Sequence, residues 1–159
     1  MEDLLIVIIR WLHVLSGVMW IGLLWYFNFV QIPSMPKIPD DQKPAIGKVI
    51  APEALFWFRW SALSTVVFGL VLAMMNGYLV DALVLSNALI GLGMWLGLIM
   101  AFNVWFVIWP NQQKALGMVA VEADAKAKAA RTAMLFSRTN TMLSIPMLFA
   151  MVAAQNMTL

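Results

Sequence analysis

The sequence contains no cysteine and only one histidine, His13. The lack of cysteine excludes disulfides, thiolate metal sites, iron–sulfur clusters and the covalent attachment of c-type haem. Charged residues make up only 11% of the chain, and no Asp or Glu falls inside its long apolar segments. A buried catalytic triad or a carboxylate proton relay therefore cannot be built within one chain, and any cofactor must bind non-covalently.

Polar surface is also scarce in this chain. Of the 159 residues, 63% are hydrophobic, and the mean hydropathy is +0.86. A soluble domain of this composition has too few polar groups to cover itself. We therefore expect one integral membrane domain over residues 1–159, with the lipid bilayer as its surroundings. The net charge of +2 predicts no nucleic acid partner, because membrane topology accounts for the positions of the basic residues.

The apolar segments predict an all-α protein, an integral membrane four-helix bundle. About 20 helical residues cross a hydrocarbon layer of roughly 30 Å. Segments of this length lie at about residues 4–32, 54–76, 83–109 and 132–154. Residues 33–52 contain five prolines and are expected to form a polar loop. In the last span, Pro146 is expected to kink the helix or to free a backbone carbonyl.

The basic residues predict the orientation of the chain in the membrane. Apart from Arg10, every Lys and Arg lies in or beside two connections, the one between the first and second spans and the one between the third and fourth. By the positive-inside rule these two connections are cytoplasmic. Both termini and the short connection after Asn76 are then outside.

His13 lies within the first predicted span. Arg10, Gly17, Trp20 and Leu24 share one helix face with it, at spacings of three and four residues. A titratable group in a membrane costs about 2.5–3.5 kcal/mol on insertion scales for Arg, Lys or Asp, so such groups usually point into a bundle. His13 is then either a metal ligand or a neutral imidazole that bridges two helices, whereas Arg10 is expected to extend to the membrane interface.

Asn103 lies deep in the third predicted span, where its amide needs a hydrogen-bond partner on another helix. Three glycines in the same span, Gly91, Gly93 and Gly97, are expected to allow close helix packing. The alternative is that they face a flat cofactor ring.

An imidazole on a membrane helix can serve as one axial ligand of haem b, with methionine or a second histidine as the other. A second histidine would have to come from another copy of the chain, because the sequence has only one. The predicted cofactor site consists of His13 as the metal ligand together with Gly17, Trp20 and Asn103.

Four stretches of the sequence resemble a known family. They are RWLHVLSGVMWIGLLWYF at 10–27, ALFWFRWSALSTVVFGLVL at 54–72, FNVWFVIWPNQQKALG at 102–117 and RTNTMLSIPMLFAMV at 138–152. Together they resemble the N-terminal membrane domain of the bacterial membrane-bound urate hydroxylases, the urate oxidase N-terminal family. Members of that family join a longer membrane region to a C-terminal cytochrome c domain and are associated with oxidation of urate to hydroxyisourate.

The resemblance implies a multi-pass protein of a bacterial inner membrane, a redox setting and electron transfer to a haem protein. His13 matches the histidine in the family's first span. This chain has no CxxCH motif and no further histidines between its first two spans, and Thr139 precedes Asn140 where the family tends to have histidine. A weaker likeness, in size and span count, is to the four-span haem-binding protoporphyrinogen oxidases.

Two functions follow from the sequence. In the first, the chain is a small membrane protein that binds haem b through His13 or carries electrons beside a redox centre. In the second, it is a non-catalytic structural or assembly subunit of a larger membrane complex, and His13 and Asn103 only bridge helices. An enzyme acting on a porphyrin or a purine is a third reading, for which the chain offers little acid–base machinery. The expected partners are a second copy of the chain or other membrane redox subunits.

Overall fold

The structure is a computed structural model that describes residues 1–157, and in this range it consists of helices and contains no strand. The predicted all-α class is therefore confirmed. The elements in chain order are α1 (Glu2–Trp25), η1 (Tyr26–Gln31), α2 (Ile32–Ser34), η2 (Met35–Lys37), α3 (Lys43–Ala45), η3 (Ile46–Ile50), α4 (Ala51–Met75), α5 (Leu79–Leu83), α6 (Ala88–Phe102), η4 (Asn103–Ile108), α7 (Trp109–Ala115) and α8 (Ala123–Asn156).

Three continuous helical runs in the described chain are long and apolar enough to cross a membrane, Glu2–Lys37, Lys43–Met75 and Ala88–Ala115. They contain the first predicted span and overlap the second and third, although the third run begins at Ala88 and residues 84–87 lie outside helix. The predicted fourth span, residues 132–154, lies within α8, which begins with a charged stretch and carries Ser, Thr and Asn side chains along its length. Crossing of the membrane by α8 stays a prediction.

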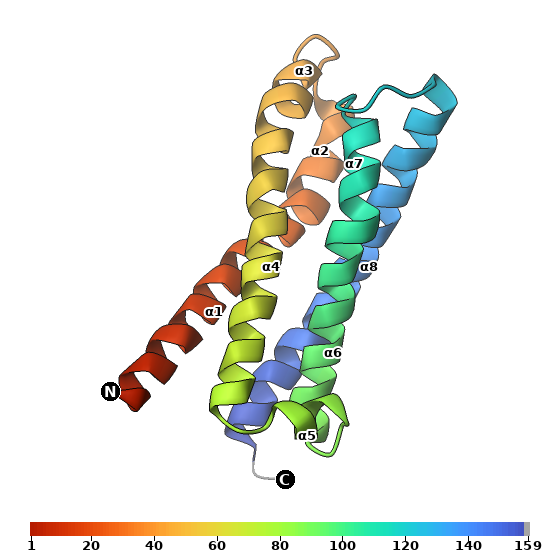
Figure 1. Ribbon diagram of the computed structural model, residues 1–159. Coiled ribbons are helices and arrows are strands. Elements are labelled where there is room, and N and C mark those ends of the chain that lie inside the picture. The colour runs from red at the N-terminus through yellow and green to blue at the C-terminus, as the bar shows by residue number, and fades with distance from the viewer. Residues whose placement is uncertain (158–159) are drawn as a thin grey trace.

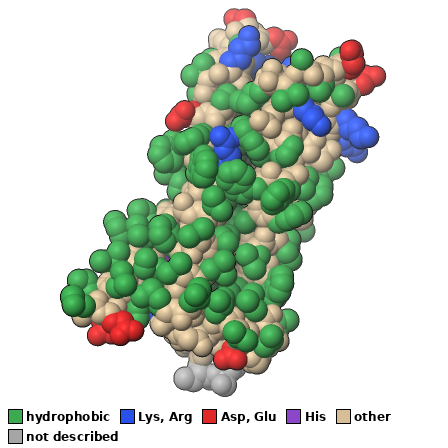
Figure 2. All heavy atoms as spheres, viewed as in Figure 1, with side chains coloured by type: hydrophobic (Ala, Val, Ile, Leu, Met, Phe, Trp, Pro, Cys, Tyr) green, Lys and Arg blue, Asp and Glu red, His purple; other side chains and the backbone are tan. Residues whose placement is uncertain are grey.

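The two ends of the molecule differ in charge. The N-terminus, α5 and the end of α8 lie together at one end, and α3, α7 and the start of α8 lie at the other (Figure 1). The Lys and Arg side chains visible in Figure 2 gather at the end that carries α3 and α7. The positive-inside rule predicts the orientation of a membrane protein from such a distribution of basic residues.

The predicted polar loop over residues 33–52 is wrong in its extent. The first helical run continues through Pro33 and Pro36 to Lys37, and the next run begins at Lys43, so only residues 38–42 lack helix. Pro33 and Pro52 do not end these helices because a π-helical turn precedes each of them.

Each π-helical element, η1, η3 and η4, ends two residues before a proline. Proline lacks an N–H group and its ring clashes with the carbonyl four residues earlier. A wider turn relieves this clash because hydrogen bonds then run to the carbonyl five residues back. These bonds join the N–H groups of Ile32, Ala51 and Trp109 to the carbonyls of Phe27, Ile46 and Val104.

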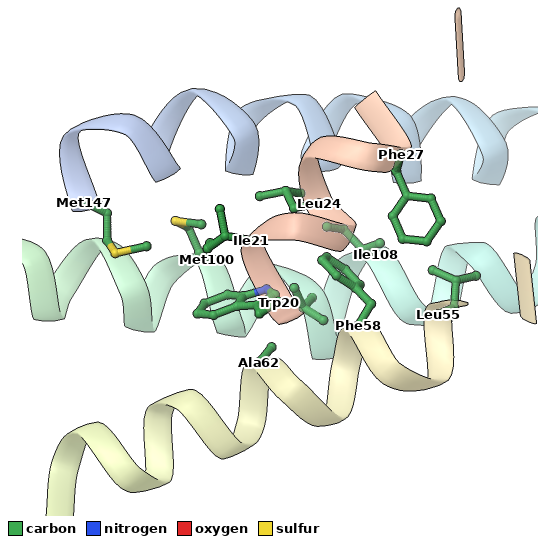
Figure 3. Packing of buried hydrophobic residues seen from close by; sticks show 11 residues of the cluster. Trp20, Ile21, Leu24, Phe27, Leu55, Phe58, Ala62, Met100, Ile108 and Met147 are labelled. Atoms are coloured by element: carbon green, nitrogen blue, oxygen red, sulfur yellow. The ribbon is translucent and has the colours of Figure 1, made fainter. Parts of the chain in front are cut away.

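The core lies where the end of α1 meets the other helices. α1 packs mainly against α4, and α6, η4 and α7 pack against α8. Figure 3 shows Trp20, Leu24 and Phe27 extending from the first run into the space among the other helices, where they meet Phe58 of α4 and Met100 of α6. Lipid tails are as apolar as these side chains, so close packing and interhelical hydrogen bonds hold such helices together rather than removal of apolar surface from water.

Two of the third-span glycines serve helix packing, as predicted. A Cβ atom at Gly91 would collide with the backbone oxygen of Ala82, because α5 lies directly on α6 at this point. A Cβ atom at Gly93 would lie 3.2 Å from the side chain of Met151 on α8. Gly97 differs, because nothing lies within 4 Å of the position that its Cβ would take.

Candidate functional site

A cleft of about 770 Å³ lies between α1, α4, α6 and α8. Its size falls in the range of about 300–1,000 Å³ that is typical of small-molecule and cofactor sites. Most of the lining is aliphatic side chains, methionines and glycines, and Arg10 is its only charged residue. We call this space the His13 cleft, because the single histidine forms part of its wall.

The imidazole of His13 is held by the backbone of α4. Its Nδ1 atom lies 2.8 Å from the carbonyl oxygen of Thr65. A carbonyl only accepts hydrogen bonds, so Nδ1 carries the proton and donates it. In the neutral ring the lone pair is therefore on Nε2, and the only hydrogen bond of the His13 ring among the described residues is the one that Nδ1 makes. A backbone carbonyl bonded to one ring nitrogen is the usual way in which the other nitrogen of a metal-binding histidine is kept free.

Gly69 provides the space that the His13 ring occupies. A Cβ atom at Gly69 would lie 2.9 Å from Cε1 and 3.1 Å from Nδ1 of His13. No larger residue could stand there without moving the ring. Gly69 follows Thr65 by four residues, so one face of α4 supplies both the bare backbone and the carbonyl acceptor.

The other residues on the predicted face of α1 also turn toward the protein. Gly17 lines the cleft, and its Cβ position lies 3.8 Å from Cγ2 of Thr65. Trp20 lies deeper, with only 1% of its surface exposed, and its Nε1 atom has no partner in the described chain. His13, Gly17 and Trp20 are thus brought together in one cleft.

Asn103, the fourth residue of the predicted cofactor site, lies outside the residues that line this cleft. Its Nδ2 atom donates to Oδ1 of Asn140 on α8 at 2.9 Å, and Asn140 in turn donates to the carbonyl of Met100 at 2.9 Å. The expected bond from Asn103 to another helix is therefore present. The partner amide is completely buried.

Asn103 of η4 contacts a row of buried polar side chains on α8, which was not predicted from the sequence. Asn28 of η1 donates to Oγ of Ser137 at 2.7 Å, and Trp25 donates to Oγ of Ser144 at 2.9 Å. Ser137, Asn140, Thr141 and Ser144 follow one another at spacings of three, one and three residues, which puts them on one face of α8. That spacing was visible in the sequence and could have indicated the face.

The cleft has a polar end near the N-terminus of α1 and the C-terminus of α8. Arg10, Tyr78, Gln155 and Asn156 line this end. Burial raises the pKa of the Tyr78 phenol, and the positive charge of Arg10 acts in the opposite direction. Arg10 on α1 and Tyr78 in the turn after α4 thus border the same end of the cleft.

The chain offers no complete set of protein ligands for a bare metal ion. Residues 1–157 contain no group of three or more His, Cys, Asp or Glu side chains placed to bind a metal. A metal bound by His13 would need most of its ligands from another molecule, as the iron of a porphyrin does. Three methionines, Met94, Met147 and Met151, also line the cleft and offer thioether sulfur.

The fold and the cleft define a class, a helical protein with helices long and apolar enough to cross a membrane and an interhelical site built around one imidazole. The family described as urate oxidase N-terminal matches residues 83–158, slightly less than half of the chain. This match confirms the predicted family over that range, which includes the cleft walls that α6 and α8 supply, whereas His13, Thr65 and Gly69 lie before it. Neither the curated proteins nor the solved structures contain a match to this chain.

Proposed function

We propose that this chain is a four-span protein of a bacterial inner membrane that binds haem b through His13 or carries electrons beside a redox centre. Its orientation in this proposal has both termini outside, because the end with α3 and α7 carries most of the basic side chains. The observation that supports haem binding best is the hydrogen bond from Nδ1 of His13 to Thr65, since it leaves Nε2 with a lone pair and no partner among the described residues.

The residues of the cleft fit a haem in three respects. The lining is apolar over most of its area, the imidazole is oriented by a backbone acceptor, and bare backbone at Gly17 and Gly97 leaves room for a flat ring. His13 would hold the iron, and Met94, Met147 and Met151 would offer thioether sulfur from the same cleft. A bound haem supplies one-electron redox chemistry. The protein's own residues supply orientation and exclude water from the cleft.

Replacing His13 with alanine is expected to remove the Soret band of the purified protein, because no other histidine can replace it. The measurement is an absorption spectrum of the detergent-solubilised protein, oxidised and then reduced. Added imidazole should restore the band in His13→Ala by entering the space left by the ring. A wild-type protein without a Soret band, or a variant with an unchanged one, would show the proposal to be wrong.

Gly69→Ala is expected to change haem binding while leaving the fold intact. The new methyl group must displace the His13 ring from Thr65, and a ring at the end of a side chain can move at little cost to the helices. Weaker haem retention or a shifted spectrum is therefore the expected result. Gly47→Ala is the matched control, because it adds the same methyl group outside the cleft, at a position where nothing lies within 4 Å. Equal spectra for the two variants would contradict the role given to Gly69.

The second candidate is a non-catalytic structural or assembly subunit. It is favoured by the bonds from His13 to Thr65 and from Asn103 to Asn140, which bridge helices without any ligand. Under this reading the protein is colourless and copurifies with other membrane subunits in a fixed ratio. His13→Ala would then weaken the α1–α4 contact and leave the spectrum unaffected.

A further inference from the structure

We infer that the His13 cleft takes an amphipathic carboxylic acid, whose acidic group is bound by Arg10 and whose apolar body lies between α1, α6 and α8. This inference rests on the proposed function for the choice of a porphyrin as the ligand body. The inference goes beyond the proposed function because it assigns recognition of the ligand's acid groups to Arg10.

The distribution of charge in the cleft carries the inference. Arg10 is the only charged residue of the lining, and no Asp or Glu borders the cleft. The one ion pair in the described part of the chain joins Lys43 to Asp40, so the guanidinium of Arg10 has no carboxylate partner there. A guanidinium beside an apolar cleft and without an acid to pair with is complementary to a ligand that brings its own carboxylate.

The position of Arg10 relative to His13 adds to this argument. The two residues are three apart on α1, which places them on the same face with a rise of about 4.5 Å between them. Tyr78, Gln155 and Asn156 surround the same end of the cleft and offer one hydroxyl and two amides as further hydrogen-bonding groups. The rest of the lining is mostly apolar, with Met147 and Leu148 among its members. One end therefore suits a carboxylate and the remainder suits an apolar ring system.

Arg10 borders the cleft and its side chain is exposed, so carboxylate recognition and simple contact with water or headgroups are separated by their different responses to the ligand's charge. An arginine that merely extends to the interface would have no preference between an acid and its ester. An arginine that binds the acid would lose most of its contribution when the acid is esterified, since the ester carries no negative charge and cannot accept a bidentate ion pair.

The test uses protoporphyrin IX without iron and its dimethyl ester, and binding of each is followed by porphyrin fluorescence with the full chain in phosphatidylcholine nanodiscs. Arg10→Met is expected to weaken binding of the diacid by about tenfold or more, the usual effect of losing a hydrogen bond to a charged group. Binding of the diester should change little. Arg10→Lys should recover part of the loss, and Lys48→Met removes the same charge from the exposed far end as a control.

Each other outcome overturns the inference. If Arg10→Met weakens acid and ester equally, the residue acts through packing; if it changes neither, or if the wild type does not bind the diacid, Arg10 does not recognise the ligand. Strong competition by phosphatidylglycerol in the nanodiscs would assign the site to a lipid phosphate instead. The iron-free probe keeps this test separate from the proposed function, because His13→Ala should abolish the haem spectrum and leave Arg10-dependent binding of the iron-free diacid in place.

Discussion

Asn140→Ala is expected to lower the free energy of unfolding by about 1–3 kcal/mol, because it leaves the buried Nδ2 amide of Asn103 unpaired. Asn140 is fully buried and also donates to the carbonyl of Met100, which keeps a bond from the backbone N–H of Asn103. Water has no access to replace the lost bonds. The measurement is a denaturant titration of the protein in detergent, followed by circular dichroism.

The adjacent Thr139 provides the control for this substitution. Its side chain is exposed and bonds only to the carbonyl of Leu135 in its own helix. Thr139→Ala should therefore change the stability by a few tenths of a kcal/mol at most. The double variant Asn103→Ala with Asn140→Ala should cost less than the sum of the single changes, since they remove the same bond. Strict additivity would mean that the pair of amides does not couple η4 to α8.

Gly91→Ala is expected to destabilise the protein by about 1–3 kcal/mol or more, the usual range for overpacking a close contact. The added Cβ would meet the backbone oxygen of Ala82 and lie 2.9 Å from Cδ2 of Leu85. A backbone atom cannot rotate away as a side chain can, so α5 must separate from α6. The turn that follows α5 is already unusual, because Leu85 has a positive φ of 61°.

Thermal unfolding in detergent would measure the effect of Gly91→Ala, and proteolysis would show whether the connection between α4 and α6 has loosened. Gly97→Ala on the same helix serves as the comparison, because its methyl group enters open space. Similar melting temperatures for the two variants would mean that α5 does not depend on its contact with Gly91.

The sequence predicted the helical class correctly, and the predicted family matches over residues 83–158. The sequence also placed His13, Gly17 and Trp20 on one face of α1. Periodicity carries this information because each helix face repeats every three or four residues. It could not supply Thr65 and Gly69, which stand on another helix some 50 residues away and act through a backbone carbonyl and a missing side chain. No pattern in the sequence indicates that a particular carbonyl faces a particular ring.

The separation of Asn103 from the cleft could not be predicted either. Its depth in the third span was clear, but the choice between the cleft and Asn140 depends on how η4 turns around its own axis.

The predicted extent of the polar loop over residues 33–52 was wrong for a related reason. Prolines normally end helices, and the wide turns before Pro33 and Pro52 that let the helices continue leave no separate mark in the composition.

These wide turns have a consequence for comparing related sequences. Each holds about one residue more than an ordinary turn, so the face presented by the following helix is rotated by roughly 100°. Asn28 and Asn103 lie inside two such turns, and both reach α8. A homologue that lacks Pro33 or Pro110 has no need of the wide turn before that proline. If it keeps the bond from Asn28 or Asn103 to α8, we expect that turn to be one residue shorter. Gaps of a single residue at these points in an alignment would mark a conserved geometry and not a lost one.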